Sequence, residues 1–272
     1  VTGVQTCALP ISSEMDPQSA IKISVILYWS ALLIYTSYWI VGFMGRRIRF
    51  YVLLGGVVLH TVSITFRGIA IEYFPLTNKF ESFTGFALAC FSVLLFYSRV
   101  ESYVYRMSTF CVGYCFYVVA SVCFSSYLMK VSYAPPLMLT IWYILHVPIS
   151  FYCYALWTSS FAAAMARYFS GGEDKRRFEN IIDAGFQYGF IAFSISMIFG
   201  GLWGYVAWGS YFLWDAKLLW SVIIWFFYAT CIHLDYWPAA RKYKAPLAIV
   251  GFVILLTTYV GTSFLIRSSH SF

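Results

Sequence analysis

Apolar residues dominate this chain in long runs, and polar residues collect in the short connections between the runs. A helix of roughly 18 to 20 apolar residues is long enough to cross a bilayer. Eight runs approach or exceed that length, at about 21–44, 50–71, 83–98, 108–129, 137–166, 181–202, 216–237 and 245–266. The pattern predicts an all-α, polytopic integral membrane bundle of about eight transmembrane helices, with no soluble domain.

Composition supports a membrane class, since 61% of the residues are hydrophobic and 11% are charged, against roughly 25% charged in soluble domains. The net charge of +7 lies in short basic clusters between apolar runs, which disfavours nucleic-acid binding. The seven cysteines form no CxxC pair, so we expect buried thiols and no metal or disulfide framework.

Residues 1–18 are unlike the rest of the sequence and are interpreted as an irregular or artefactual leader. The native start is then Met15 or is missing. Residues 19–272 are interpreted as the membrane domain.

Positive charge predicts the orientation of the bundle, because cytoplasmic connections collect Lys and Arg. Alternate connections hold 12 of the 18 basic residues: Arg46, Arg47, Arg49, Arg99, Arg106, Arg167, Lys175, Arg176, Arg177, Arg241, Lys242 and Lys244. Both termini and the connection after residue 202 should then face outward. In a bacterium this is the periplasmic or extracytoplasmic side of the cytoplasmic membrane, and in a plastid the protein would lie in the thylakoid membrane.

The outward connection, 203–217, is unusually aromatic. Its flat apolar faces, which suit a planar ring, come from Trp203, Trp208, Tyr211, Phe212 and Trp214. An interfacial aromatic belt is the alternative interpretation, because Trp and Tyr are common at membrane interfaces. Asp215 stands where the next helix begins, and a carboxylate there is expected to cap free N–H groups whether or not the segment binds a ligand.

Four histidines lie at two depths of the predicted bundle. His146 and His270 fall at the outer ends of the fifth and eighth helices, whereas His60 and His233 fall within the hydrocarbon. Two imidazoles facing each other from different helices are a usual way to hold heme iron, and an ionisable residue inside a membrane is a functional candidate by default. Each histidine taken singly could equally be a helix-packing residue. Lys217 and Arg67 are candidates for a heme propionate or for lipid headgroups.

Several segments carry a family likeness. AWGSYFLWDAKLLW (207–220) resembles the tryptophan-rich WWD segment of the CcsA/ResC family of cytochrome c assembly proteins, which belongs with CcmC and CcmF to a larger heme-handling group. Further similar segments are LHTVSITFR (59–67), FPLTNKFES (74–82), ILHVPISFYCYAL (144–156), FFYATCIHL (226–234) and SSHSF (268–272). The likeness runs from about residue 50 to the C-terminus and matches all four histidines in order.

The resemblance implies that heme b is carried across the membrane through a site ligated by His60 and His233, with a CcsB/ResB partner. It implies that His146 and His270 ligate heme at the outer WWD segment, where its vinyl groups meet the thiols of a CxxCH motif in apocytochrome c. Thioether formation there would make the complex a cytochrome c heme lyase, with positioning as the main catalytic device. Thiol-reducing proteins would supply the reducing side of the chemistry, and the bilayer lipid surrounds the bundle.

The segment departs from the family pattern at four positions. Phe212 stands where Trp is usual, Ala216 replaces Pro as in CcmC, and Leu218 and Leu219 replace Glu and Thr. Eight spans and four histidines nevertheless favour CcsA over the smaller CcmC. Two alternatives stay open: a CcmC-type heme exporter or chaperone without lyase activity, and a quinone-linked b-type membrane cytochrome.

Overall fold

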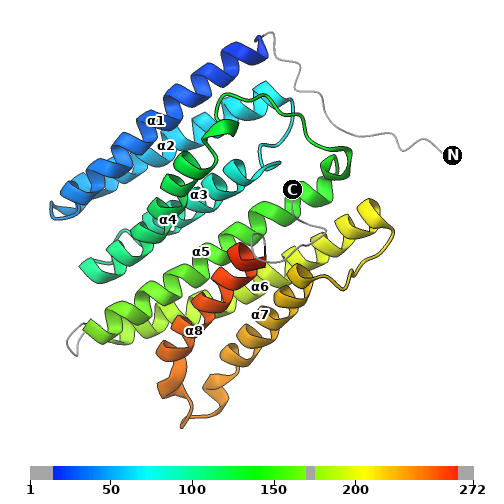
Figure 1. Ribbon diagram of the computed structural model, residues 1–272. Coiled ribbons are helices and arrows are strands. Elements are labelled where there is room, and N and C mark those ends of the chain that lie inside the picture. Colours follow the sequence, from blue (N-terminus) through cyan, green and yellow to red (C-terminus); the bar gives the residue numbers. More distant parts are fainter. Residues whose placement is uncertain (1–14, 170–174, 263–272) are drawn as a thin grey trace.

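The computed structural model describes residues 15–169 and 175–262, which form an all-helical bundle (Figure 1). The α-helices are α1 (Pro17–Val41), α2 (Arg46–Ile71), α3 (Lys79–Phe96), α4 (Tyr103–Cys123), α5 (Ile141–Phe169), α6 (Lys175–Trp208), α7 (Ala216–Ile232) and α8 (Lys244–Leu256). Short 3-10 turns η1 (Ser125–Tyr127), η2 (Pro136–Met138), η4 (Leu234–Tyr236) and η5 (Arg241–Tyr243) and a π-helical turn η6 (Thr257–Gly261) lie between or after them. The predicted all-α fold is confirmed.

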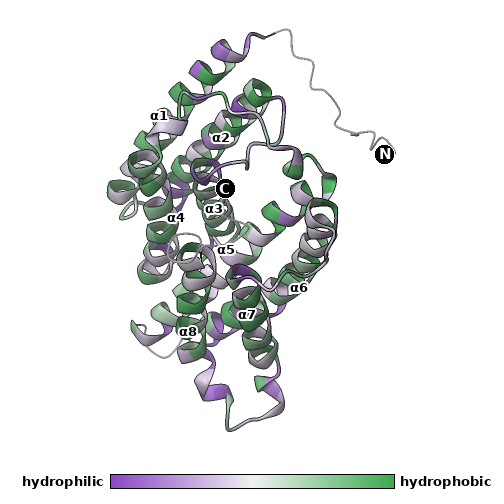
Figure 2. Ribbon diagram, turned by 45° about the vertical axis from the view of Figure 1, so that its right-hand side comes forward, coloured by the Kyte–Doolittle hydropathy of each residue, from purple (hydrophilic) through white to green (hydrophobic). Residues whose placement is uncertain are grey.

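Within the described residues, seven helical segments are long and apolar enough to cross a membrane: α1 to α4, α6, Ala216–Tyr236 and Arg241–Gly261. Hydrophobic residues run along these helices, and the connection between α7 and α8 is largely hydrophilic (Figure 2). α5 is long enough but less apolar, and it is the helix that packs against α3, α4, α6 and α8. Because protein rather than lipid covers much of α5, it can carry buried serines and threonines. The chain is thus a polytopic integral membrane protein, as predicted.

Close packing of α5 on α6 sets the frame of the bundle. A β-carbon at Gly185 would collide with the Ser160 hydroxyl, and one at Gly189 with the Trp157 indole. The absence of side chains at these two glycines lets the helices approach. Trp157 also stacks on Tyr228 of α7 at 3.7 Å between ring centroids. The α1–α2 hairpin lies on the far side of α3 and α4 from α6 and α7 (Figure 1).

Side-chain caps mark the starts of α1, α3, α4 and α7. The Asp16 carboxylate accepts the Ser19 N–H at 3.0 Å, and Pro17 occupies the first helical turn of α1. α3 begins after Asn78, whose Oδ1 accepts the Glu81 N–H at 3.0 Å. Such caps satisfy N–H groups that have no partner within the helix. The predicted cap by Asp215 is confirmed.

The ends of α6 and α7 differ from the predictions. α6 was expected over 181–202 but runs to Trp208, because no proline interrupts it and the chain turns only at Gly209, where φ is +71°. Residues 203–208 are therefore helical, and the connection to α7 is only 209–215. α7 was expected to reach Trp237 but ends at Ile232, and a 3-10 turn precedes Pro238.

The chain ends differ from the predicted boundaries as well. α1 starts at Pro17, so the last two residues assigned to the leader are helical, and residues 1–14 lie outside the described part. α8 starts at Lys244 as expected, and its last described turn is π-helical. The predicted end of the last span and His270 lie beyond residue 262, outside the described residues.

Candidate functional site

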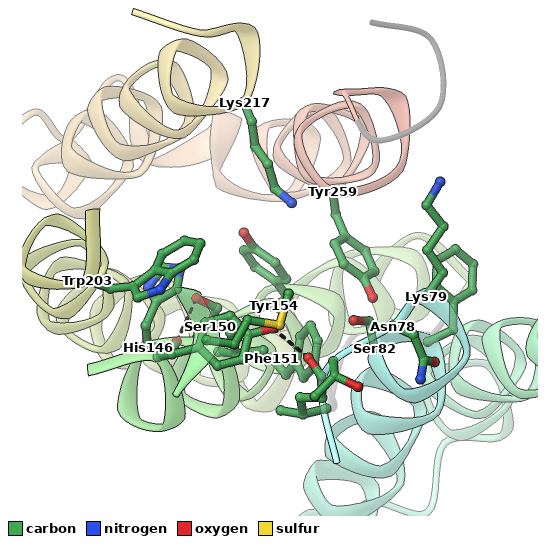
Figure 3. Close-up of a pocket in the computed structure, with 16 residues that line it drawn as sticks. Asn78, Lys79, Ser82, His146, Ser150, Phe151, Tyr154, Trp203, Lys217 and Tyr259 are labelled. Carbon is green, nitrogen blue, oxygen red and sulfur yellow. Dashed lines mark hydrogen bonds between the residues drawn. The ribbon is translucent and has the colours of Figure 1, made fainter. Parts of the chain in front are cut away.

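A pocket opens where the start of α3, the first half of α5, the end of α6 and the start of α7 meet (Figure 3). Its empty space, open mouth included, is about 880 Å³. Six residues between 76 and 83 and six α5 residues between 143 and 154 form most of the walls. The other lining residues are Met138, Trp203 of α6, Lys217 of α7 and Tyr259 of η6. Segments that are far apart in the sequence, at 74–82, 144–156 and 203–217, are thus brought to one cavity.

His146 lines this pocket and is held by α6. Its Nδ1 lies 2.8 Å from the carbonyl oxygen of Ser196. A carbonyl only accepts, so the neutral ring carries its proton on Nδ1 and its lone pair on Nε2, the atom that can ligate a metal. The imidazole lies nearly parallel to the Trp203 indole, with 6.3 Å between centroids and 18° between planes.

Hydrogen bonds to backbone carbonyls fix the pocket walls. The buried Trp203 indole donates to the Leu137 carbonyl at 2.7 Å, and the Tyr143 hydroxyl donates to the Leu76 carbonyl at 2.5 Å. The Tyr73 hydroxyl donates to the carbonyl of Met138. Burial raises the pKa of Tyr73, so its hydroxyl remains a donor at neutral pH. Three aromatic donors therefore fasten the connections before α3 and α5 to each other and to α6.

The aromatic segment divides into a buried and an exposed part. Trp208 packs edge-on against Trp203, with 4.9 Å between centroids. Tyr211 stacks on Tyr205 of α6 at 4.5 Å. Phe212 and Trp214 pack edge-on against each other, and Trp214 is 86% exposed. Only Trp203 of these rings lines the pocket, so the single flat platform expected from the sequence is instead one pocket wall with an exposed aromatic loop beside it.

The two predicted candidates for an anionic group have different surroundings. Lys217 lines the pocket from the first turn of α7. Arg67 is buried and fully engaged: its Nε lies 2.6 Å from Glu81, and its other nitrogens donate to the carbonyls of Tyr127 and Leu128. Glu81 also accepts from Thr77. Arg67 therefore acts as a brace between α2, α3 and the segment after α4 and lines no part of the main pocket.

His60 lies deep in the bundle, about 21 Å from the start of α2 at 1.5 Å per residue. It is fully buried, and its ring packs edge-on against Tyr117 at 4.8 Å. Its Nδ1 makes only a long contact, 3.4 Å, with the Tyr35 hydroxyl. Its Nε2 is buried without a hydrogen-bond partner among the residues the structure describes, and a small cavity adjoins the ring. A buried nitrogen without a partner is costly and often marks a functional position.

His233 is not beside His60 in the structure. It directly follows α7, is exposed, and its Nδ1 lies 2.6 Å from the Ala229 carbonyl of its own helix. α2 packs against α1 and α3, whereas α7 packs against α6 and α8. His270, the expected companion of His146, lies outside the described residues. The last described residue, Thr262, comes three positions after Tyr259 of the pocket wall.

Several lining residues were missed by sequence reasoning. Ser150 and Tyr154 follow His146 at spacings of four and eight, so all three lie on one face of α5, and this periodicity was a usable signal. Asn78 and Tyr259 gave no such signal. Their position depends on how α3 and α8 pack against α5, which the local sequence does not specify.

The sequence is similar to known proteins over most of its length. The family model described as "Cytochrome C assembly protein" matches residues 76–270, most of the chain. The cytochrome c biogenesis protein CcsA of Guillardia theta is 25% identical over 291 residues, covering 91% of this chain and 94% of that protein. CcsA of Prochlorococcus marinus is 25% identical over 286 residues, with 87% of each chain covered. CcsA of Gloeobacter violaceus is 41% identical over 87 residues, which are 31% of this chain and 25% of that protein.

A solved structure shares the fold. The cytochrome c heme lyase CcmF superposes with a TM-score of 0.66 at 14% sequence identity, covering 94% of this chain and 48% of that one. The present chain therefore spans about half the length of CcmF. At this level of identity the similarity shows a common helical arrangement, and it places the pocket within a fold seen in an experimental structure.

Proposed function

The chain belongs to the cytochrome c assembly protein family and serves cytochrome c maturation, and from this premise we propose that its main pocket presents heme to apocytochrome c for covalent attachment. The heme is a substrate that passes through the protein. We propose heme b as the species, because its two vinyl groups are the ones that attachment consumes. The protein would work as one subunit of a cytochrome c heme lyase, with a CcsB/ResB-like membrane partner.

One observation carries the proposal: His146 and Trp203 line the same pocket with nearly parallel rings, and the Nδ1 atom of His146 is held by the Ser196 carbonyl of α6. An imidazole whose Nδ1–H is fixed by a carbonyl presents Nε2 in a defined direction, which is how proteins orient an axial ligand. Tyr154, Phe151 and Phe83 supply apolar lining for a planar ring. The donor and the lining therefore suit a heme, with His270 proposed as the second axial ligand.

The reaction itself requires little chemistry from the protein. Each cysteine thiol of the CxxCH motif adds across one vinyl group, so that sulfur bonds to the carbon next to the ring and hydrogen to the terminal carbon. No electrons are gained or lost in this addition. Holding the two vinyl groups and two thiols together is the main contribution, and such positioning is worth several kcal/mol. The exposed rings of Tyr211, Phe212 and Trp214 lie beside the pocket, where an incoming peptide can contact them.

Heme must also be delivered through the membrane to the main pocket. His60, with its buried and unpartnered Nε2, is proposed as a ligand for heme at membrane depth, and His233 as its companion. In the described structure the rings of Tyr35 and Tyr117 enclose His60, so binding there requires these helices to separate and α7 to approach. The pocket is proposed to face the periplasmic or extracytoplasmic side, because the basic connections lie at the opposite helix ends.

The experiment is reconstitution. The chain is co-expressed with a CcsB partner and a CxxCH reporter in a host that lacks its own maturation pathway, and covalent heme on the reporter is measured by heme staining after denaturation. His146→Ala should abolish attachment while heme still co-purifies with the protein. Wild-type protein that binds heme but attaches none would leave a CcmC-type exporter or chaperone as the function. Reduction of bound heme by quinol, with no attachment, would favour a b-type cytochrome.

A further inference from the structure

Lys217 reaches into the main pocket from the side opposite α5. Its side chain extends from the first turn of α7 toward Tyr154 and Tyr259 (Figure 3). Within residues 15–169 and 175–262 its ammonium group forms no hydrogen bond or ion pair. Its charge is attracted by Asp215, which caps α7, and repelled by Lys79. A partly buried ammonium without a close counter-ion is costly, so this position favours an anionic partner from a ligand.

Asn78 offers a second unused donor at the same pocket. Its Oδ1 accepts the Glu81 N–H as the cap of α3, which fixes the amide so that Nδ2 is the donor atom. That Nδ2 is buried and has no hydrogen-bond partner among the described residues. A carboxylate oxygen accepts such a donor well. The Oδ1 atom of Asn78 is thus used in capping α3, and its Nδ2 group can donate to a ligand.

The charges around the pocket point the same way. Its described lining contains Lys79 and Lys217 and no Asp or Glu. Two carboxylates are close to the lining residues in the sequence: Glu81 is bonded to Arg67 and Thr77, and Asp215 caps α7. The N-terminal end of α3, which carries partial positive charge, also lies in this wall. The rest of the lining is largely apolar and aromatic, so the pocket combines a ring-sized apolar space with a localised anion-binding edge.

We propose that Lys217 and Asn78 bind the carboxylate side chains of the planar ring that enters this pocket. The inference rests on the proposed function and extends it, since it fixes which edge of heme enters first. The two propionates of heme share one edge of the ring. One vinyl group lies on the opposite edge, and the other lies on a side edge, so neither is next to a propionate. With the propionates at Lys217 and Asn78, the vinyl-bearing part of the ring is turned away from α7 and left accessible to thiols.

The test uses porphyrins without iron, so that histidine ligation contributes nothing. The purified full chain in detergent micelles is titrated with protoporphyrin IX and with its dimethyl ester, and binding is followed by fluorescence. Wild type should bind the free acid roughly 10- to 100-fold more tightly than the ester, the range expected for a charged hydrogen bond. Lys217→Met should remove that preference, and Lys217→Arg should keep most of it.

Two further variants define the site. Asn78→Ser keeps a capping oxygen but lacks the amide donor, so it should reduce the preference without removing it. Lys130→Met is the matched control, because it makes the same substitution at a lysine that does not line the pocket. The Lys130 ammonium lies over the Tyr127 ring, 5.9 Å from its centroid. Equal wild-type affinity for acid and ester, or an unchanged preference in Lys217→Met, overturns the inference. Failure of wild type to bind either iron-free porphyrin also overturns the inference, whereas failure of wild type to bind heme itself overturns the proposed function.

Discussion

The His146 imidazole packs directly on Gly200 of α6, and a β-carbon at position 200 would stand 2.8 Å from its Cε1 atom. Gly200 lies one helical turn after Ser196, whose carbonyl holds the Nδ1 of the same ring. The ring can reach that carbonyl only because position 200 carries no side chain. The orientation of the candidate ligand is therefore determined as much by α6 as by α5.

Gly200→Ala should push the His146 ring away from α6 and weaken its bond to Ser196. Misplacing a reacting or ligating group by about 1 Å can cost about 100-fold, so heme attachment to a CxxCH reporter should fall about 10- to 100-fold. The matched control is Gly201→Ala, where the nearest atom would be the Tyr211 carbonyl at an ordinary 3.5 Å. Both alanines improve helix propensity equally, so equal attachment by the two variants would show that the His146 contact is irrelevant.

The buried pair of Arg67 and Glu81 should dominate the stability of the α2–α3 region. Removing one partner leaves a buried charge without compensation, which typically costs about 3–5 kcal/mol. We expect Arg67→Met to lower the unfolding free energy in SDS titration by about that amount, and Arg67→Met with Glu81→Gln to lower it less. The half-exposed pair of Arg167 and Glu179 is the comparison, and Glu179→Gln should cost about 1 kcal/mol or less. Similar losses at both pairs would contradict the assigned burial.

Substitutions of Trp203 and Trp214 should have different effects: the first should lower the unfolding free energy, and the second should lower heme attachment. Trp203→Phe removes the donor to the Leu137 carbonyl, and an unsatisfied buried carbonyl costs about 1–3 kcal/mol. Trp214 is 86% exposed, so Trp214→Phe should change the unfolding free energy by less than about 0.5 kcal/mol. If the exposed loop contacts apocytochrome c, Trp214→Ala should still reduce attachment. A stable Trp203→Phe variant would mean that the indole bond does not hold the pocket wall.

The sequence was sufficient for the eight long helices seen in the described residues, but it singled out only three residues of the pocket lining, His146, Trp203 and Lys217. Apolar runs predict helices reliably in a membrane, because unpaired backbone groups are not tolerated there. The sequence did not predict where α6 ends within the aromatic segment. A Trp- and Tyr-rich run resembles an interfacial loop, yet residues 203–208 continue α6 until Gly209 adopts a positive φ. Periodicity alone could not locate that turn.

The surroundings of charged and polar residues were harder to predict than the helices. The sequence does not distinguish Arg67 from Lys217 as a candidate for binding an anion, but in the structure Arg67 pairs with Glu81 and Lys217 lines the pocket. Which one is engaged depends on contacts between α2, α3 and the segment after α4, which are far apart in the chain. Likewise, depth and the family resemblance both pair His60 with His233, whereas in the described structure α2 packs against α1 and α3, and α7 against α6 and α8.

His60→Ala should reduce the supply of heme to the main pocket without altering that pocket. Its Nε2 is buried without a partner in the described part of the chain, and loss of an axial ligand should lower co-purified heme by at least about tenfold. The Soret absorbance of purified protein per polypeptide is the measurement. Tyr35→Phe is the control, because it removes only a hydroxyl 3.4 Å from the His60 ring and should leave the heme content within about twofold, since so long a contact contributes little.

Comparison with the other histidines makes this prediction specific. His146→Ala should keep bound heme and lose attachment, whereas His60→Ala should lose both. His233→Ala should match His60→Ala if α7 approaches α2 during transfer, and should match wild type if His233 stays at the end of α7, where the structure places it. Identical heme content in the variants of His60, His146 and His233 would contradict two separate heme positions, because two positions with different ligands predict different heme contents when one ligand or the other is removed.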